Sequence, residues 1–121
     1  MPFPSPADDF AEKRLDVTDL LMPQPTSTYF MRVSGDAMIG YGIGDRDIVV
    51  IDRALKASDQ AIIVARLGEA FTLRRIRMKD GRVWLVAANS AYGAIEVTKR
   101  EDFEVWGVVT WVLHKIAWRL R

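Results

Sequence analysis

The pattern of apolar and polar residues predicts two parts with different secondary structure. After residue 27 the chain alternates short β-branched and aromatic runs with glycine, aspartate and asparagine, which is typical of strands separated by turns. The runs predicted to be strands are 29–33, 47–51, 61–66, 70–78, 82–87, 95–98 and 105–113. Strands at this spacing indicate a mainly β fold, arranged as small twisted sheets or a partly closed barrel.

Residues 1–27 differ in composition from the rest of the chain, with prolines near the start and the end. Ser5 and Pro6 form a helix-start signal, because the hydroxyl can cap free N–H groups and proline fits the first turn. A short helix or pair of helical turns is predicted over 6–22, and the prolines that follow end it. Its expected buried side chains are Phe10, Leu15, Leu20 and Leu21. We expect a single domain, with an arm and short helical segment over 1–27 and a β domain over 28–121.

Two features are predicted within the β domain. The turn KDGR, residues 79–82, contains the Asp-Gly pair that tight hairpins favour. Side chains alternate along a strand, so Arg74 shares a face of the 70–78 run with Ile76. A basic residue is therefore expected beside an apolar one in this strand.

The balance of charge argues against direct binding of DNA. The sequence holds 17 lysine and arginine residues against 16 aspartate and glutamate residues, so no large electrostatic field attracts a polyanion. The basic stretch 74–82 and the tail residues Lys115, Arg119 and Arg121 are better explained as solvated faces. Any contact with DNA is expected to be indirect.

Composition also excludes several kinds of site. The chain has no cysteine, which rules out disulfides and thiolate metal sites, and we expect neither a metal nor a cofactor. Its one histidine, His114, lies in an apolar run and is interpreted as a strand or interface residue. The first 22 residues carry charges where a secretory signal is apolar, and the longest apolar run, 105–113, is too short to span a membrane. A soluble cytoplasmic protein without a membrane partner is expected.

Four ordered blocks of the sequence resemble one known group of proteins. The blocks are FPSPADDFAEKRLD, YFMRVSGDAMIGYGIGDRDIVVID, AFTLRRI and VAANSAYGAIEV. Together they are similar to the UmuD branch of the LexA-like self-cleaving proteins over nearly the whole chain. In that family the pattern S-G-D-S-M presents a nucleophilic serine, and a lysine in the pattern F-T-V-K acts as its general base. The resemblance places Ala37 at the serine position and Arg74 at the lysine position.

These two residues cannot perform the family's chemistry. A serine attacks only after a base removes its proton, and a lysine can be that base only when burial lowers its pKa. Alanine has no nucleophilic atom, and an arginine guanidinium stays protonated at working pH. The neighbouring turn also departs from the pattern, with Tyr41 and Arg46 where relatives usually carry glycines. The catalytic positions Ala37 and Arg74 are therefore predicted to be inactive.

Neither of two other serines is expected to replace the missing nucleophile. Ser34 is interpreted as a hydrogen-bonded residue at the end of a strand, and Ser90 as part of a turn. The predicted strand 70–78 contains no lysine, and Lys79 falls at its turn end. A rebuilt serine-lysine pair is not expected.

The C-terminal run, residues 105–121, is apolar on both faces and carries large side chains. A strand of this kind must be covered on both faces, either as a central core strand or by a partner subunit. The residues themselves leave both explanations open, whereas the family resemblance favours a dimer built partly from this segment. The expected interface residues are Trp106, Val108, Trp111 and Leu113.

The resemblance also implies a function. In UmuD-like proteins an N-terminal arm is cleaved after a Cys-Gly pair just ahead of a segment resembling FPSPA, and the shortened product acts in mutagenic DNA synthesis. This sequence begins with Met1 and Pro2 followed by FPSPA, which is where the processed form would start. The leading hypothesis is a non-catalytic homodimer in the SOS response that binds a Y-family DNA polymerase and the RecA filament, and so permits translesion synthesis.

Two other functions remain open at this point. The chain could be a serine-lysine self-cleaving peptidase of the UmuD or LexA type that substitutions at Ala37 and Arg74 have disabled. It could also be the dimerisation module of a phage-type repressor, which shares the fold and carries a helix-turn-helix domain upstream. The FPSPA segment favours the UmuD branch over the repressor.

Overall fold

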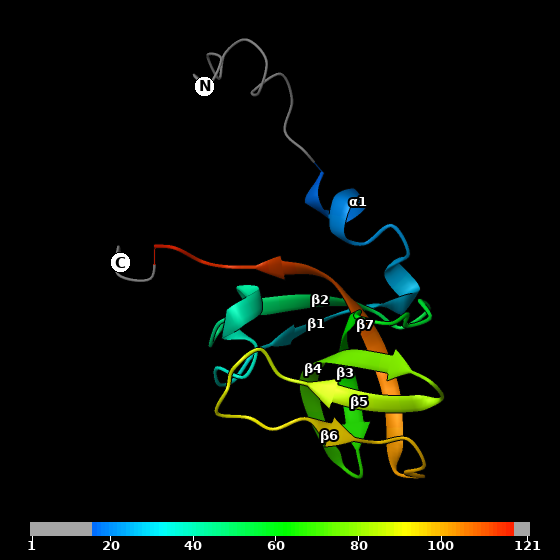
Figure 1. The fold of residues 1–121 in the computed structure, drawn as a ribbon. Helices are drawn as coiled ribbons and strands as arrows, with labels where there is room; N and C mark the ends of the chain where they lie inside the picture. Colours follow the sequence, from blue (N-terminus) through cyan, green and yellow to red (C-terminus); the bar gives the residue numbers. More distant parts are fainter. Residues whose placement is uncertain (1–15, 118–121) are drawn as a thin grey trace, which may run out of the picture.

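The computed structural model describes residues 16–117 and is mainly β, as the sequence predicts (Figure 1). One sheet contains all of its strands. They are β1 Thr28–Arg32, β2 Ile48–Asp52, β3 Ile62–Leu67, β4 Ala70–Lys79, β5 Arg82–Val86, β6 Ile95–Glu96 and β7 Phe103–Leu113. The helical elements are α1 Val17–Leu21 and the short 3-10 turns η2 Pro25–Ser27 and η3 Ile39–Tyr41. Every predicted strand is present, and each boundary lies within two residues of its expected place.

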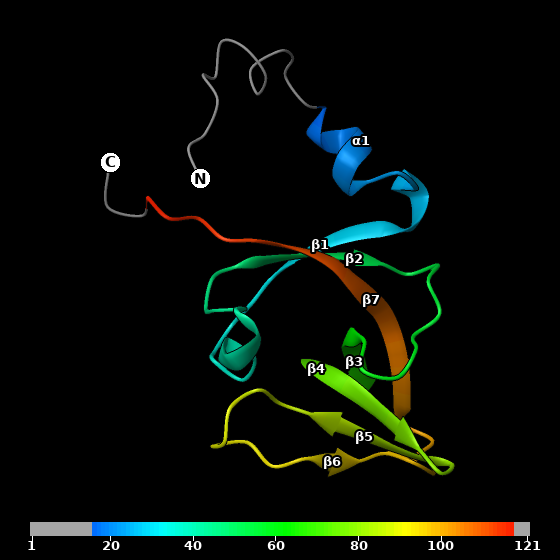
Figure 2. The same ribbon diagram turned by 45° about the horizontal axis from the view of Figure 1, so that its top comes forward.

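The strands form a single antiparallel sheet in the order β1-β2-β7-β3-β4-β5-β6. The sheet does not close, so β1 and β6 are its edges. Figure 2 shows the long strand β7 curving from the β1–β2 part of the sheet to the β3–β6 part. Register shifts lie between Val50 and Ile51 and between Val64 and Ala65, where β2 and β3 pair with β7. Such bulges sharpen the bend of a sheet, which explains the curved shape.

Two clusters of buried side chains hold the bent sheet together. The first consists of Met38, Ile43, Val49, Ile51 and Val64. The second consists of Ile63, Ala65, Ile76, Leu85 and Val97. Neighbouring strand residues such as Val64 and Ala65 enter different clusters because successive side chains point to opposite faces. The first cluster packs under the segment that carries Ala37, so it supports the candidate site directly.

A glycine on β7 allows β7 and β2 to approach closely. A Cβ atom on Gly107 would lie 2.4 Å from Cγ2 of Ile51 and 3.5 Å from the carbonyl oxygen of Asp52. Carbon atoms that are not bonded do not approach to the first of these distances, so a side chain here would push β2 and β7 apart. Gly107 thus permits the tight pairing that brings both parts of the sheet together.

The short helix α1 differs in part from the prediction. Asp16 caps it, because one carboxylate oxygen accepts a hydrogen bond from the Thr18 N–H over 3.0 Å. The helix ends before Pro23, as expected. Leu21 is 6% exposed, but Leu20 is 46% exposed, so the prediction that Leu20 is buried is wrong. A five-residue helix turns only one narrow stripe toward the sheet, and Leu21 occupies that stripe.

Other predictions for the N-terminal segment and the turns have different outcomes. The helix start at Ser5 and the burial of Phe10 and Leu15 fall outside the described residues. The hairpin between β4 and β5 is confirmed, because Asp80 has φ 54° and Gly81 has φ 76°, as a type I′ turn requires. None of the helices in residues 16–117 has the length and apolar character needed to cross a membrane.

Candidate functional site

Ala37 lies in a turn that backbone hydrogen bonds fix on both sides. Gly35 starts the turn with φ 93°, and its N–H donates to Oδ1 of Asp45 over 2.7 Å. The Ala88 N–H donates to the Ala37 carbonyl oxygen over 2.8 Å, and the Gly40 N–H donates to the Ala88 carbonyl oxygen over 2.9 Å. This reciprocal pair ties the turn to the loop after β5. The half-buried Ala37 methyl is therefore held in a defined position.

Arg74 occupies β4, and its guanidinium folds back against its own strand. Nη1 donates to the carbonyl oxygen of Leu73 over 2.7 Å, and the guanidinium carbon lies 5.3 Å from the centre of the Tyr92 ring. Nε is buried and has no hydrogen-bond partner among the described residues. Burial lowers the pKa of Arg74, although Tyr92 raises it in part. The group nevertheless stays charged, because an arginine pKa lies far above neutral pH.

Tyr92 and Asp36 complete this corner of the site, and the sequence did not point to them. The Tyr92 hydroxyl donates to Oδ1 of Asp36 over 2.9 Å, and this hydrogen bond and the negative charge raise the pKa of Tyr92. Asn89 supports the same link, because its Nδ2 donates to the Asp36 carbonyl oxygen over 3.1 Å. The only sequence signal for Tyr92 is the stretch AANSAYG, which resembles a structural element of the family.

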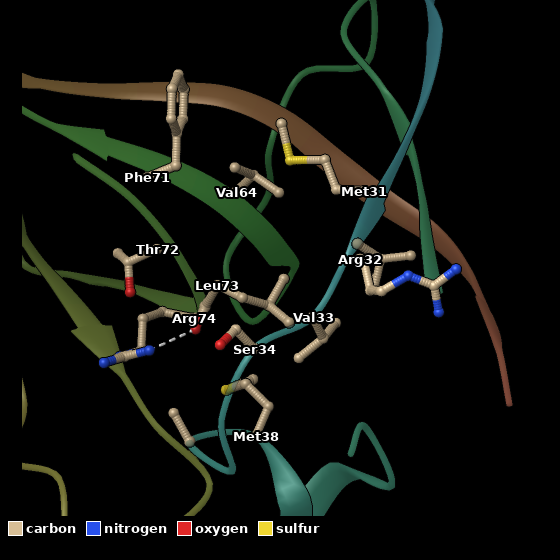
Figure 3. Close-up of a pocket in the computed structure, with 12 residues that line it drawn as sticks. Met31, Arg32, Val33, Ser34, Met38, Val64, Phe71, Thr72, Leu73 and Arg74 are labelled. Carbon is tan, nitrogen blue, oxygen red and sulfur yellow. Dashed lines mark hydrogen bonds between the residues drawn. The ribbon is translucent and has the colours of Figure 1, made fainter. Parts of the chain in front are cut away.

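The structure brings Ala37 and Arg74 to one cleft of about 230 Å³ (Figure 3). One wall is the end of β1 and the residues after it, from Met31 to Ser34, and the other wall is the first half of β4, from Phe71 to Arg74. Met38 and other apolar side chains form the floor. In Figure 3 the Arg74 side chain lies at one end and the Phe71 ring at the other. The cleft thus combines an apolar interior with one charged end.

Other candidate nucleophiles and bases are differently placed. Ser34 lines the cleft, is exposed and makes no side-chain hydrogen bond within residues 16–117. Its interpretation as a hydrogen-bonded strand-end residue is wrong, because β1 already ends at Arg32. Ser90 lies exposed in a turn and does not line the cleft, and no lysine lines it either. A serine-lysine pair is therefore not rebuilt from the cleft's own lining residues.

The turn after the Ala37 segment has an unusual backbone. Arg46 has φ 71°, in the left-handed region that glycine prefers. A glycine at position 46, as expected in relatives, would adopt this conformation without strain. Tyr41 lies in η3, and its ring centre is 5.2 Å from the guanidinium carbon of Arg75.

The four residues expected at an interface separate into two pairs. Trp106 packs against the first buried cluster and Val108 against the second. Trp111 is 43% exposed and Leu113 is 36% exposed. The reading of β7 as an inner strand is confirmed, because β7 lies between β2 and β3. Only its C-terminal part leaves large apolar side chains on the surface.

Trp106 is the centre of an aromatic cluster at the Phe71 end of the cleft. Its ring centre lies 5.2 Å from that of Tyr29 and 5.8 Å from that of Phe71, both in edge-to-face geometry. The guanidinium carbon of Arg53 lies 4.3 Å from the Trp106 ring centre, and Arg53 Nε donates to the Trp106 carbonyl oxygen over 2.8 Å. These contacts assign Trp106 a structural position between β1 and β4.

The exposed apolar side chains of β7 continue across the neighbouring strands. Phe30 on β1 is paired with Val50 on β2, and Val50 is paired with Trp111 on β7. Directly paired residues point to the same side of a sheet, so Phe30 and Trp111 flank Val50 on one face. Phe30 is 45% exposed, whereas Val50 is fully buried. This face is called the outer apolar face below, and it also includes Leu113.

His114 follows the end of β7, so of the two interpretations, strand or interface residue, the first is wrong and the second stays a prediction. Its Nδ1 lies 2.5 Å from Oδ1 of Asp47, which is 2% exposed. Oδ2 of Asp47 accepts a hydrogen bond from the Gly44 N–H over 2.8 Å. Burial acts to raise the pKa of Asp47, but the Gly44 hydrogen bond and the His114 contact outweigh it and leave that pKa lowered. The pair fixes the chain beyond β7 and is not part of the cleft.

Comparison with known proteins identifies the family. The family model for peptidase S24-like proteins matches residues 1–110. The chain belongs to the peptidase S24-like family. It is 35% identical over 113 residues to protein SamA of Salmonella typhimurium, covering 93% of this chain and 78% of SamA. It is 37% identical over 109 residues to protein MucA of Escherichia coli, covering 89% of this chain and 74% of MucA.

The same comparisons confirm the expected branch of the family. The chain is also similar to LexA repressor 2 of Pseudomonas syringae pv. tomato, with 42% identity over 80 residues, which cover 66% of this chain but 40% of the repressor. Coverage is much broader for SamA and MucA than for this repressor. This S24-like chain is therefore a UmuD-like protein related to SOS mutagenesis.

The described residues offer no evident place for a metal ion. No group of three or more histidine, cysteine, aspartate or glutamate side chains in residues 16–117 is arranged to hold one. What the cleft itself offers is apolar surface, the hydroxyls of Ser34 and Thr72, and the guanidinium of Arg74. These groups can bind a ligand, and at positions 37 and 74 they include no pair of nucleophile and base.

Proposed function

We propose that this UmuD-like protein is a non-catalytic accessory subunit of an error-prone Y-family DNA polymerase. It acts in the cytoplasm during SOS mutagenesis, as a homodimer that also contacts the RecA filament and touches DNA only through its partners. The observation that carries the proposal is the pair Ala37 and Arg74 in an otherwise well-formed cleft. Similarity to SamA and MucA supports the SOS role.

The chemistry of the two residues supports a function without peptide hydrolysis. Attack on a peptide carbonyl needs a nucleophilic atom, which the Ala37 methyl lacks. Proton abstraction needs a base, and the Arg74 guanidinium has no free lone pair at working pH. Because the cleft walls are nevertheless intact, the fold keeps its binding surfaces while the reaction is lost. Function then depends on association with other proteins.

The outer apolar face supports the homodimer. Phe30 on β1 and Trp111 and Leu113 on β7 expose large apolar side chains on the two strands that flank β2. A contiguous exposed apolar patch is typical of a surface that another protein covers. The resemblance to UmuD-like proteins implies a dimer built partly from this C-terminal segment, which agrees with a second copy in this place.

A reconstituted primer-extension assay tests the proposed function. The purified protein, the cognate Y-family catalytic subunit and a RecA filament are combined on a template that carries one lesion. We expect this protein to bind the polymerase and to increase extension past the lesion, with no effect on an undamaged template. Absence of both binding and stimulation would reject the proposal. Buffer alone and a heat-denatured sample of the protein serve as controls.

A disabled self-cleaving peptidase is the second candidate function. The observation that favours it is the retained cleft, in which positions 37 and 74 lie at the same opening. Restoring serine and lysine at these positions distinguishes a site that lacks only these two groups from one that has also lost its catalytic geometry.

A further inference from the structure

The cleft has an unbalanced charge. Its lining residues include two arginines, Arg32 and Arg74, and no aspartate or glutamate. Arg32 donates through Nη1 to the Arg46 carbonyl oxygen over 2.9 Å, and in Figure 3 its side chain points away from Arg74. The charge at the Arg74 end is therefore supplied by one guanidinium. A ligand of the opposite charge is the natural complement of this end.

The Arg74 guanidinium retains most of its capacity to donate hydrogen bonds. Of its five N–H groups, one at Nη1 donates to the Leu73 carbonyl oxygen and the Nε–H is buried without a partner in residues 16–117, so three at Nη1 and Nη2 are left for a ligand. The Asp36 carboxylate is engaged by the Tyr92 hydroxyl and forms no ion pair with Arg74 among residues 16–117. Partial burial strengthens the interaction of this cation with an anion. A carboxylate matches the planar guanidinium better than any neutral group does.

The walls of the cleft suit an extended chain. β5 pairs with β4 only from Arg75 to Lys79, so the first half of β4 presents a backbone edge that no described strand covers. An added strand can hydrogen bond to such an edge while its side chains enter the cleft. Phe71, which is 52% exposed, lies three residues from Arg74. That spacing corresponds to about 10 Å along a strand.

The direction of Arg74 shows which part of a peptide can reach it. Successive residues of a strand point to opposite faces, so the Arg74 side chain leaves β4 on the face opposite to Leu73. A group that meets the guanidinium must likewise leave its own backbone sideways. A carboxylate on a side chain does this, whereas a carboxylate that ends a peptide lies in line with the backbone.

We propose that the cleft binds an extended peptide whose glutamate or aspartate side chain pairs with Arg74 and whose apolar side chain, about three residues away, lies near Phe71. This inference rests on the proposed function, because only a cleft that does not cut its occupant can hold such a peptide stably. In this role Arg74 contributes to binding, because it selects an acidic ligand.

Three matched peptides test the inference by NMR titration of the ¹⁵N-labelled protein. The first is an acetylated and amidated alanine heptapeptide with one leucine and one glutamate three residues apart. The second has glutamine in place of the glutamate. The third is the glutamine peptide with a free C-terminal carboxylate. We expect the glutamate peptide to bind at least ten-fold more tightly than the glutamine peptide, equivalent to about 1.4 kcal/mol. The shifts should centre on the amides of β4 and the Arg74 Nε–H.

Substitutions identify the group responsible. Arg74→Gln should bring the affinities of the glutamate and glutamine peptides to the same value, whereas Arg74→Lys should keep part of the difference, because charge remains without the planar fork. Arg75→Gln is the matched control, because Arg75 stacks on Tyr41 and donates to Gln60 outside the cleft. It should leave the preference unchanged. The same spectra show whether each variant is folded.

The possible outcomes separate this inference from the proposed function. Equal affinity for the glutamate and glutamine peptides, or a preference that survives Arg74→Gln in a folded variant, would overturn the inference. Preferred binding of the third peptide would overturn it in favour of a terminal carboxylate. Mass spectrometry after the titration should find the peptides intact. Cleaved peptide would instead refute the non-catalytic function itself.

Discussion

His114 Nδ1 lies 2.5 Å from Oδ1 of Asp47, a residue 67 positions earlier in the chain. The contact joins the residue after β7 to the residue before β2, at the end of two paired strands. Asp47 is almost completely buried, and its other oxygen accepts the Gly44 N–H. A buried carboxylate is stable only when such partners replace water, so this pair stabilises the end of β7 that carries the outer apolar face.

The Asp47 contacts predict an acid-dependent loss of stability. The pKa of Asp47 is lower in the folded protein than its ordinary value of 3.8. The ionised form therefore favours folding fully above about pH 5, and this contribution is lost as the pH falls through the folded pKa. Asp47→Ala should lower the free energy of unfolding at pH 7 by about 2 kcal/mol and flatten its dependence on pH below 5. Urea unfolding at pH 7, 5 and 3 measures both effects.

The exposed carboxylate Glu69 supplies the control for that experiment. Glu69→Gln should change the free energy of unfolding by less than about 0.5 kcal/mol at pH 7. If Asp47→Ala follows the same acid unfolding curve as the unchanged protein, Asp47 is not the group that links stability to pH.

The split between Trp111 and Trp106 predicts different effects for two similar side chains. Trp111→Glu places a charge on the outer apolar face and should weaken the proposed dimer at least 100-fold while the protomer stays folded. Trp106→Ala should instead lower the free energy of unfolding by about 3 kcal/mol, because Trp106 packs between Tyr29 and Phe71. Sedimentation equilibrium measures association, and urea unfolding measures stability.

Met78→Glu provides the control for the dimer experiment, because Met78 is similarly exposed but lies beside the β4–β5 hairpin. It should leave the association constant unchanged. A Trp111→Glu protein that still forms the dimer would place the interface elsewhere on the molecule.

The sequence predicts the strands of this protein well because the signals involved are local. Alternation of side chains and turn residues marks each run, and the pair Asp80 and Gly81 specifies its hairpin through backbone conformation alone. The motif resemblance also brings positions 37 and 74 to the same site, which the cleft agrees with. What these signals share is that each depends on a few consecutive residues.

Other features depend on contacts that no local pattern contains. Trp106 packs between Tyr29 and Phe71, which are distant in sequence, whereas Trp111 is exposed, although both belong to one apolar run. The pairing of His114 with Asp47 joins distant segments, and so does that of Tyr92 with Asp36. Such pairs cannot be predicted from local sequence, because their residues meet only when the bent sheet has placed their elements side by side.

The close contact between Gly107 and Ile51 predicts that a side chain at position 107 destabilises the pairing of β2 and β7. Gly107→Ala should lower the free energy of unfolding by about 2 kcal/mol, because the new methyl would lie 2.4 Å from Cγ2 of Ile51. Ile51→Leu removes that branch at nearly constant volume, so the double variant should be more stable than the sum of the single effects. Chemical denaturation of the four proteins gives the coupling energy.

A second glycine distinguishes this clash from a general effect of replacing glycine. No atom lies within 4 Å of a Cβ built on Gly93, and its φ is not in the left-handed region. Gly93→Ala should therefore be nearly neutral. Equal losses at both positions would show that steric contact with Ile51 is not the cause.

Restoring a serine at position 37 and a lysine at position 74 tests whether the scaffold can still support the family's reaction. With an N-terminal arm containing a Cys-Gly junction supplied, Ala37→Ser together with Arg74→Lys should cleave the arm. Burial, which lowers the pKa of Arg74, also disfavours the charged form of a lysine there and so favours a neutral base. The cleavage rate should rise with pH until that lysine is deprotonated. Gel electrophoresis and mass spectrometry between pH 6 and 10 measure the product.

The single variants supply the controls. Ala37→Ser alone should remain intact, because the Arg74 guanidinium cannot accept the serine proton, and Arg74→Lys alone should remain intact, because no nucleophile is present. Cleavage by Ala37→Ser alone would reveal another base near the turn. An inert double variant would show that the site has also lost the geometry for attack, because its nucleophile and base would both be present without reacting.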